Sequence, residues 1–152
     1  MIRKARPDEC LGIARFMKRF EEDSKLIRVD VEHAALMHSR AIERETGIIF
    51  ILCDDTTGEM QGGLGAIFGP SMIMDEIVAV ETFWYVAPEH RGRGLKLWLA
   101  FEEWAKRKGC QKVAMVHLAD SSPNELGQLY VRRGYELIES HYVREIGGTP
   151  CR

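Results

Sequence analysis

A short basic segment of the sequence combines residue types that bind anions. It reads Arg91-Gly92-Arg93-Gly94-Leu95-Lys96-Leu97. An apolar run at 77–86 precedes it, Pro88 ends that run as a strand, and apolar residues at helical spacing continue to about Lys108. Backbone N–H groups in the first turn of a helix bind phosphate, and glycines permit positive φ and a close approach to the backbone. Residues 91–97 are therefore predicted to cradle an anion between a strand and a helix.

Two common phosphate-binding motifs do not fit this segment. The Walker sequence is missing, and a G-x-G-x-x-G motif would need glycine where Leu97 stands. The segment instead resembles the pyrophosphate loop of the GNAT superfamily of N-acetyltransferases, R/Q-x-x-G-x-G/A, with Lys96 in place of the final small residue. The resemblance implies that Arg91 to Leu97 hold the pyrophosphate of acetyl-CoA. It also implies that the backbone of Trp84, Tyr85 and Val86 pairs with the pantetheine arm.

A second GNAT motif matches in part near the C-terminus. Leu129-Tyr130-x-x-x-Gly134-Tyr135 fits the second half of N-x-x-A-x-x-L-Y-x-x-x-G-F/Y, whereas Asn124 stands one place after the expected asparagine. The resemblance implies that Tyr130 protonates the leaving thiolate and that Asn124 contacts the cofactor. A phenol with a pKa of about 10 suits that acid role. The alternative for Tyr130 is a packed tyrosine on a helix face.

Glu81 is the candidate general base, because it interrupts an apolar central strand where an unused carboxylate is costly. Burial there is expected to raise the pKa of the carboxyl group. Glu81 shares strand parity with Phe83 and Tyr85, unless a bulge of the kind the family carries reverses that parity. The alternative is a carboxylate ion-paired at the strand edge. His117 is a second candidate base, and Asp75 and Glu76 are less central.

Hydrophobic periodicity and turn residues predict the remaining elements. Asp30 is the expected N-cap of the second helix, and Gly47 its expected C-cap. Strands are expected at 1–6, 48–53, 60–68, 77–86, 112–118 and 135–146, the last as one strand or a hairpin, and helices at 7–20, 30–45, 95–108 and 121–133.

This order predicts a mixed α/β (α+β) fold, with helices on both faces of the sheet. It is also the order of the GNAT fold, which implies a central, mixed and mostly antiparallel sheet. Residues 1–146 are expected to form one domain, with 147–152 as a flexible tail.

Composition excludes several function classes. The net charge of the 152 residues is −2, so the basic segment is local and nucleic-acid binding is not expected. The four cysteines form no C-x-x-C pair, which argues for reduced thiols in the cytoplasm and against a metal site. No apolar run is long enough for a membrane span, and no membrane partner is expected.

The resemblance implies transfer of an acetyl group from acetyl-CoA to an amine by direct attack in a ternary complex. The acceptor is unreadable from the sequence: small amines, antibiotics, protein lysines and N-termini all remain open, as does a homodimer. Residues 24–29, the second helix and the chain after Tyr135 are where such folds shape the acceptor pocket. The alternatives are a non-catalytic acyl-CoA-binding module and an interaction or nucleic-acid domain using the Arg91–Gly94 turn.

Overall fold

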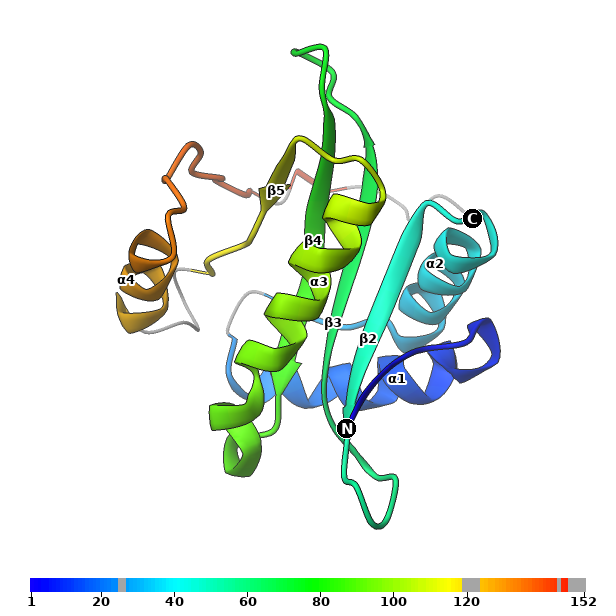
Figure 1. Cartoon of the computed structure of the whole chain (residues 1–152). Coiled ribbons are helices and arrows are strands. Elements are labelled where there is room, and N and C mark those ends of the chain that lie inside the picture. Colours follow the sequence, from blue (N-terminus) through cyan, green and yellow to red (C-terminus); the bar gives the residue numbers. More distant parts are fainter. Residues whose placement is uncertain (25–26, 119–123, 145, 148–152) are drawn as a thin grey trace. The chain divides into compact units, whose positions relative to one another are not determined.

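The computed structural model describes residues 1–24, 27–118, 124–144 and 146–147 of the chain. These residues fall into two compact units, Met1–Ser121 and Ser122–Arg152, each of which is described by itself. The first unit contains the whole sheet (Figure 1).

The sheet has five strands in the order β1-β2-β3-β4-β5. They are β1 (Ile2–Lys4), β2 (Gly47–Cys53), β3 (Met60–Pro70), β4 (Ile77–Val86) and β5 (Lys112–Ala114). The first four pair antiparallel, and β5 runs parallel to β4. The prediction of a mixed, mostly antiparallel sheet is confirmed.

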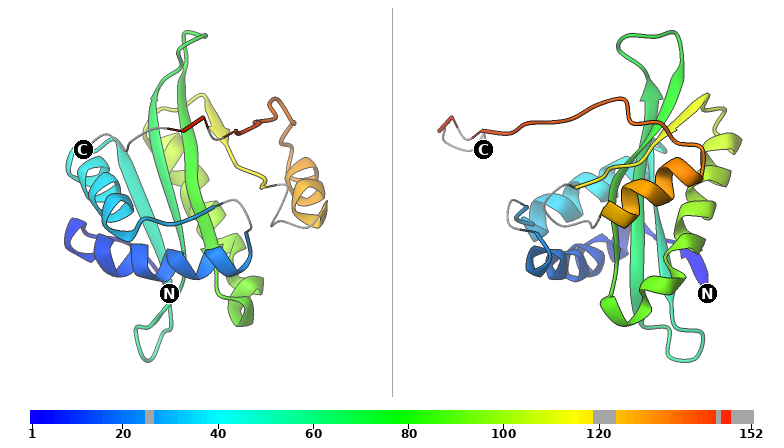
Figure 2. Two further views of the ribbon diagram at one scale, coloured as in Figure 1. Left: turned by 180° about the vertical axis from the view of Figure 1, so that it is seen from behind. Right: turned by 90° about the vertical axis from the view of Figure 1, so that its left-hand side faces the viewer.

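Helices cover both faces of this sheet, as predicted (Figure 2). The first face carries α1 (Cys10–Met17), with the 3-10 turns η1 (Pro7–Glu9) and η2 (Lys18–Glu22) at its two ends, and α2 (Val31–Glu43). The second face carries α3 (Leu95–Arg107), which follows the 3-10 turn η3 (Pro88–Arg93). The side chain of Asp30 accepts the backbone N–H of His33 and caps α2 as expected.

Each face of the sheet has its own apolar core. On the α1 side, Ile49, Ile51 and Cys53 of β2 pack with Cys10 and Ile13 of α1. On the other side, the largest buried side chains are those of α3, namely Leu97, Trp98, Phe101 and Trp104. Trp104 lies edge-on to Phe68 of β3, with 5.5 Å between ring centroids. Burial on both faces fixes the register of the central strands.

The prediction that Gly47 caps α2 is wrong. The helix ends at Glu43, and Glu45 takes the positive φ of 57° that turns the chain into β2. Gly47 is the first residue of β2, where an added Cβ would lie 2.8 Å from the Cβ of Ala41. Its glycine is required by close packing between the strand and α2, not by a turn.

Two strand predictions near the C-terminus are also wrong. The predicted strand 112–118 ends at Ala114. The last residue pair between β4 and β5 is Val80 with Ala114, and the segment after Ala114 has no strand pairing with β4. Residues 135–144 and 146 form no strand. Their apolar side chains are exposed, including Leu137, Ile138 and Tyr142. A strand requires a partner edge, and the described residues of the second unit contain no other strand.

The second unit contains one described helix, α4 (Asn124–Arg132). Gly134 follows it with a φ of 85°, and the backbone N–H of Tyr135 bonds to the carbonyl of Tyr130. This bond and the positive φ of Gly134 close the helix with a glycine cap.

Candidate active site

The parallel strands β4 and β5 form a short fork. Val78, Ala79 and Val80 of β4 pair with Lys112, Val113 and Ala114 of β5. From Glu81 to Val86, β4 keeps its pairing to β3 but has no further partner in β5. The segment that follows β5 runs away from β4 (Figure 1). One edge of β4 therefore offers N–H and C=O groups with which an extended ligand can pair.

A β-bulge shifts the orientation of β4 at this fork. Phe83 lies opposite Gly65 of β3, but Glu81 lies opposite the adjacent Ala66, so that Thr82 is an extra residue. Neighbouring residues on β3 face opposite sides of the sheet, so Glu81 and Phe83 do too. Phe83 packs against the α1-side core. The bulge thus reverses the simple strand parity of Glu81.

Glu81 is buried at the fork, with 6% of its surface exposed. Its Oε2 accepts the backbone N–H of Val116 at 3.0 Å. The carboxylate therefore bridges β4 and the segment that follows β5. Burial raises the pKa of Glu81 to about 7, and the hydrogen bond from Val116 partly opposes this rise. A carboxyl group with such a pKa alternates between acid and base near neutral pH.

The loop between β4 and α3 has the predicted position but not the predicted backbone conformation. Among the described residues, the positive-φ glycines do not include Gly92 or Gly94, and the φ of Gly94 is −61°. An added Cβ at Gly94 would lie 3.2 Å from Val86 Cγ2 and 3.4 Å from Trp84 Cζ2. A side chain at Gly94 would therefore require its neighbours to shift slightly, because the N-terminus of α3 approaches β4 closely.

The first turn of α3 presents its backbone toward the end of the sheet. Leu95 and Lys96 occupy the first two helical positions, where N–H groups lack a partner within the helix. The N–H of Leu97 instead bonds to the carbonyl of Gly94 at 2.9 Å, and the Leu97 side chain is fully buried. The donors of this turn that suit an anion are thus those before Leu97.

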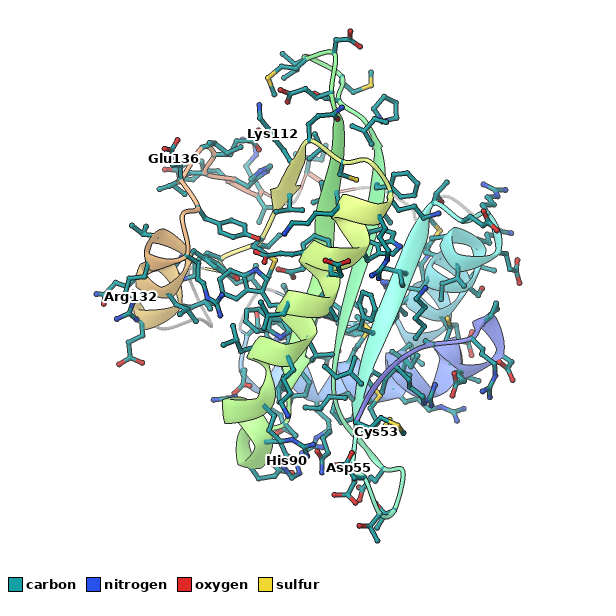
Figure 3. The ribbon with its side chains drawn as sticks, viewed as in Figure 1. Cys53, Asp55, His90, Lys112, Arg132 and Glu136 are labelled. Atoms are coloured by element: carbon teal, nitrogen blue, oxygen red, sulfur yellow. The ribbon has the colours of Figure 1, made fainter. Side chains whose placement is uncertain are left out.

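Both arginines of the loop contact acidic or amide side chains. Arg91 Nη2 lies 2.7 Å from Asp23 Oδ2, beyond the end of η2. Arg93 donates to Gln61 Oε1 and lies 3.8 Å from Asp55 Oδ2. Asp55 and His90 mark this end of the sheet in Figure 3. Arginine side chains held in this way are positioned before a ligand arrives.

Two aromatic residues, Trp84 and Tyr85, lie near the end of β4 beside the loop. Tyr85 is 7% exposed and packs on Phe16 and Phe20, with ring centroids 5.5 and 5.9 Å away. Trp84 packs edge-on to Trp98 at 5.8 Å. Its indole N–H is buried and has no hydrogen-bond partner within the described part of the chain. These contacts make the end of β4 a rigid platform beside the loop.

Two predicted site residues belong to the second unit. Tyr130 is 7% exposed, and its ring centroid lies 5.9 Å from that of Tyr135. Asn124 is the first residue of α4. Tyr130 and Asn124 thus share one helix, while Glu81, the end of β4 and the loop share one strand and turn of the first unit.

The other acidic candidates lie away from the fork's centre. Glu76 forms an ion pair with Lys112 at 2.7 Å, which joins the start of β4 to β5. Asp75 and His117 are exposed. Neither Val116 nor Asp23 has a recognisable signal in the sequence, because Val116 acts through its backbone N–H and an acid after a helix is common.

A sequence model of the acetyltransferase (GNAT) family matches residues 11–135. The chain belongs to the GNAT family. No curated protein matches the chain significantly.

Solved structures with the same fold include enzymes with different acceptors. An aminoglycoside acetyltransferase from a soil metagenomic sample is 17% identical, with a TM-score of 0.73 and coverage of 97% of this chain and 98% of that one. A ribosomal-protein-alanine N-acetyltransferase from Brucella melitensis is 16% identical (TM-score 0.70; 96% and 99%). Glucosamine-6-phosphate N-acetyltransferase from Arabidopsis thaliana is 14% identical (TM-score 0.71; 97% and 98%). At such identities the likeness establishes the fold alone.

The described residues contain no group of three or more histidine, cysteine, aspartate or glutamate side chains placed to hold a metal ion. They also contain no helix with the length and hydrophobicity needed to cross a membrane.

Proposed function

We propose that this GNAT protein transfers an acetyl group from acetyl-CoA to an amine, with Glu81 as general base. The observation that carries the proposal is the buried Glu81 carboxylate at the point where β4 and β5 separate, on the strand that leads into the loop. A pKa of about 7 lets this carboxylate take a proton at neutral pH.

The residues of the first unit suit acetyl-CoA as a substrate. The open edge of β4 from Glu81 to Val86 suits the amide groups of pantetheine, and the loop residues Arg91 to Lys96 suit its pyrophosphate. Gly94 supports this fit, because a side chain there would displace the loop from β4. The exposed Lys96 adds a positive charge at the second position of α3.

The proposed reaction proceeds by direct attack. Glu81 takes a proton from the acceptor ammonium group, directly or through water, and the free amine attacks the thioester carbonyl carbon. A C–N bond forms, and backbone N–H groups of the open β4 edge are candidate donors to the oxyanion. The C–S bond then breaks, and the thiolate takes a proton from the Tyr130 phenol. The nitrogen loses its second proton, which restores the phenol directly or through water, and Glu81 releases its own proton to solvent. The products are an acetylated amine and CoA.

Calorimetric titration with acetyl-CoA, followed by a thiol-release assay with a panel of amines, tests this proposal. Micromolar binding together with turnover supports it. Binding without turnover by any class of amine would favour a non-catalytic acyl-CoA-binding module. Absence of binding would contradict the assignment of the loop. The net charge of −2 argues against a nucleic-acid surface, because such surfaces carry an excess of basic side chains.

A further inference from the structure

A second basic region lies on the α1 side of the first unit. It is an open hollow of about 580 Å³. Its lining residues come from α1, η2 and the chain that follows: Arg15, Lys18, Arg19, Glu21, Glu22 and Arg28. None of these residues has a role in the reaction proposed above. We call this region the basic hollow.

The charges of the basic hollow are unbalanced. Four basic side chains and two acidic ones line it, in a chain whose net charge is −2. One of the two acids, Glu21, lies 4.0 Å from Lys18 Nζ and also accepts the backbone N–H of Val29 at 2.7 Å, so three cations face the remaining acid, Glu22. Arg15 has no ion pair or hydrogen bond within the described residues. The hollow therefore attracts anions and repels the ammonium form of an acceptor amine.

Two arginines of the basic hollow are oriented by contacts within the protein. Arg28 Nη1 donates to the carbonyls of Ser24 at 3.3 Å and Ile27 at 2.8 Å. Arg19 lies over the ring of Phe16, 5.4 Å from its centroid. The guanidinium groups of Arg19 and Arg28 are thus oriented in the free protein, which lowers the entropy lost when they bind a ligand.

The basic hollow adjoins the proposed pyrophosphate loop. Arg19 lies 3.7 Å from Glu89 of η3, and Asp23 after η2 contacts Arg91 of the loop. Phe16, between Arg15 and Lys18 in sequence, packs on Tyr85 at the end of β4. Two ion pairs and one ring contact therefore place the hollow beside the end of β4 that leads into the loop.

We propose that the basic hollow is a second anion site of the transferase, separate from residues 91–97, which binds a phosphate or carboxylate group of one of the two substrates. The proposal rests on the proposed function. Two sources supply this chemistry: the 3′-phosphate of CoA and an anionic group on the acceptor amine.

Distance along β4 makes the two sources distinguishable. Tyr85 follows Glu81 by four residues, which is about 13 Å of extended strand. An acceptor that reaches the hollow from Glu81 must therefore carry its anion far from its amine, as an acidic peptide does. The 3′-phosphate is the nearer source, because it belongs to the end of CoA that carries the pyrophosphate.

The test compares two double variants of equal charge change. Arg15→Ala with Lys18→Ala removes two cations from the hollow, and Lys106→Ala with Arg107→Ala removes two from the last turn of α3 as a control. The control residues are about 16 to 18 Å along the helix from Leu95. Calorimetry measures the affinity for acetyl-CoA and for acetyl-3′-dephospho-CoA. Kinetics measures KM for amine pairs that differ only in a distant carboxylate or phosphate.

If the hollow binds the 3′-phosphate, the hollow variant should bind acetyl-CoA about 3- to 10-fold more weakly but bind the dephospho compound normally. If it binds the acceptor, acetyl-CoA affinity should stay constant, and KM should rise about 3- to 10-fold for the anionic member of each amine pair alone. The difference in affinity or KM between the hollow variant and the wild type should shrink at high salt. Equal behaviour of the hollow and control variants in both arms would overturn the proposal.

A failure of the proposed function gives a different result. Wild-type protein would then neither bind nor turn over acetyl-CoA. The hollow is still testable in that case by titration with inorganic pyrophosphate. Weaker binding by the hollow variant than by the control variant would support an anion site, and equal binding would overturn it.

Discussion

Replacing Glu81 by glutamine removes its charge and keeps an oxygen that can accept the N–H of Val116. The bridge across the fork is therefore retained, while the base is lost. A general base contributes about 10²- to 10⁴-fold to the rate, so kcat should fall by at least about 100-fold. Acetyl-CoA affinity should change less than about threefold, because the loop and the open edge of β4 are untouched.

The pH dependence of turnover gives a sharper signature. With the pKa of Glu81 near 7, the base form is lost as the pH falls, and wild-type kcat should decline below about pH 7. This acidic limb should disappear in Glu81→Gln. Ionisation of the acceptor amine adds a limb of its own, which is the same in both proteins. Thiol release measured from pH 5.5 to 9 at saturating acetyl-CoA shows the difference.

The free energy of unfolding should depend on pH in the opposite direction to kcat. The carboxyl of Glu81 ionises near 4.5 in the unfolded chain and near 7 in the folded protein. Between these values the folded state retains a proton that the unfolded chain has released, so stability falls as the pH rises. Each unit of difference between the folded and unfolded pKa is worth about 1.4 kcal/mol in the free energy of unfolding. The full loss of stability above pH 7 is therefore about 3 kcal/mol. Urea unfolding should find Glu81→Gln more stable than wild type at pH 8, by up to that amount, and equal to it near pH 4.

Glu76→Gln is the matched control. It is the same substitution at Glu76, which directly precedes β4 and forms an ion pair with Lys112. It should keep the acidic limb and most of the turnover. The reasoning about Glu81 is refuted if Glu81→Gln retains kcat within threefold of wild type. It is also refuted if both variants keep the same acidic limb, in which case the base is His117 or a water.

Four further substitutions test the loop, the strand end and the acid. Gly94→Val should weaken acetyl-CoA binding more than tenfold in calorimetry while circular dichroism still reports a folded domain, because the branched side chain would crowd Val86 and Trp84 and shift the loop; normal binding would contradict the loop assignment. Lys96→Gly should weaken binding severalfold if the ammonium contacts phosphate, and unchanged affinity would leave only its backbone in that role. Tyr130→Phe should lower kcat about 100-fold or more at near-constant affinity, and unchanged kcat would make Tyr130 structural. Trp84→Phe should cost less stability in urea than Trp98→Phe, because the Trp98 N–H donates to Glu102, whereas the Trp84 N–H has no partner among the described residues; a larger loss for Trp84→Phe would show that its N–H is satisfied.

The elements around the loop were predictable because local signals determine them. The apolar run ends at Pro88, the helical pattern starts after Gly94, and Gly109 with its φ of 74° terminates α3. Asp30 caps α2 for the same local reason. Each of these signals acts within a few residues, so one sequence is sufficient to read them.

The features that the sequence could not supply depend on contacts between distant segments. The bulge at Thr82 appears only in the register of β4 against β3, because an extra residue has no signature of its own. Val116 contributes a backbone N–H, which every residue except proline has. The apolar pattern at 135–146 is that of a strand, but a strand forms only where a partner edge is present.

The geometry of the fork sets the strength of the proposed base. Burial alone would raise the pKa of Glu81 further, and more of the carboxyl group would then be protonated at pH 7. The N–H of Val116 stabilises the ionised form and draws the pKa back toward 7. That N–H bonds to Glu81 beyond the end of β5 at Ala114. Glu81 faces away from the α1-side core because Thr82 is bulged. The short β5 strand and the bulge in β4, neither of which follows from the sequence, therefore tune the same proton-transfer group.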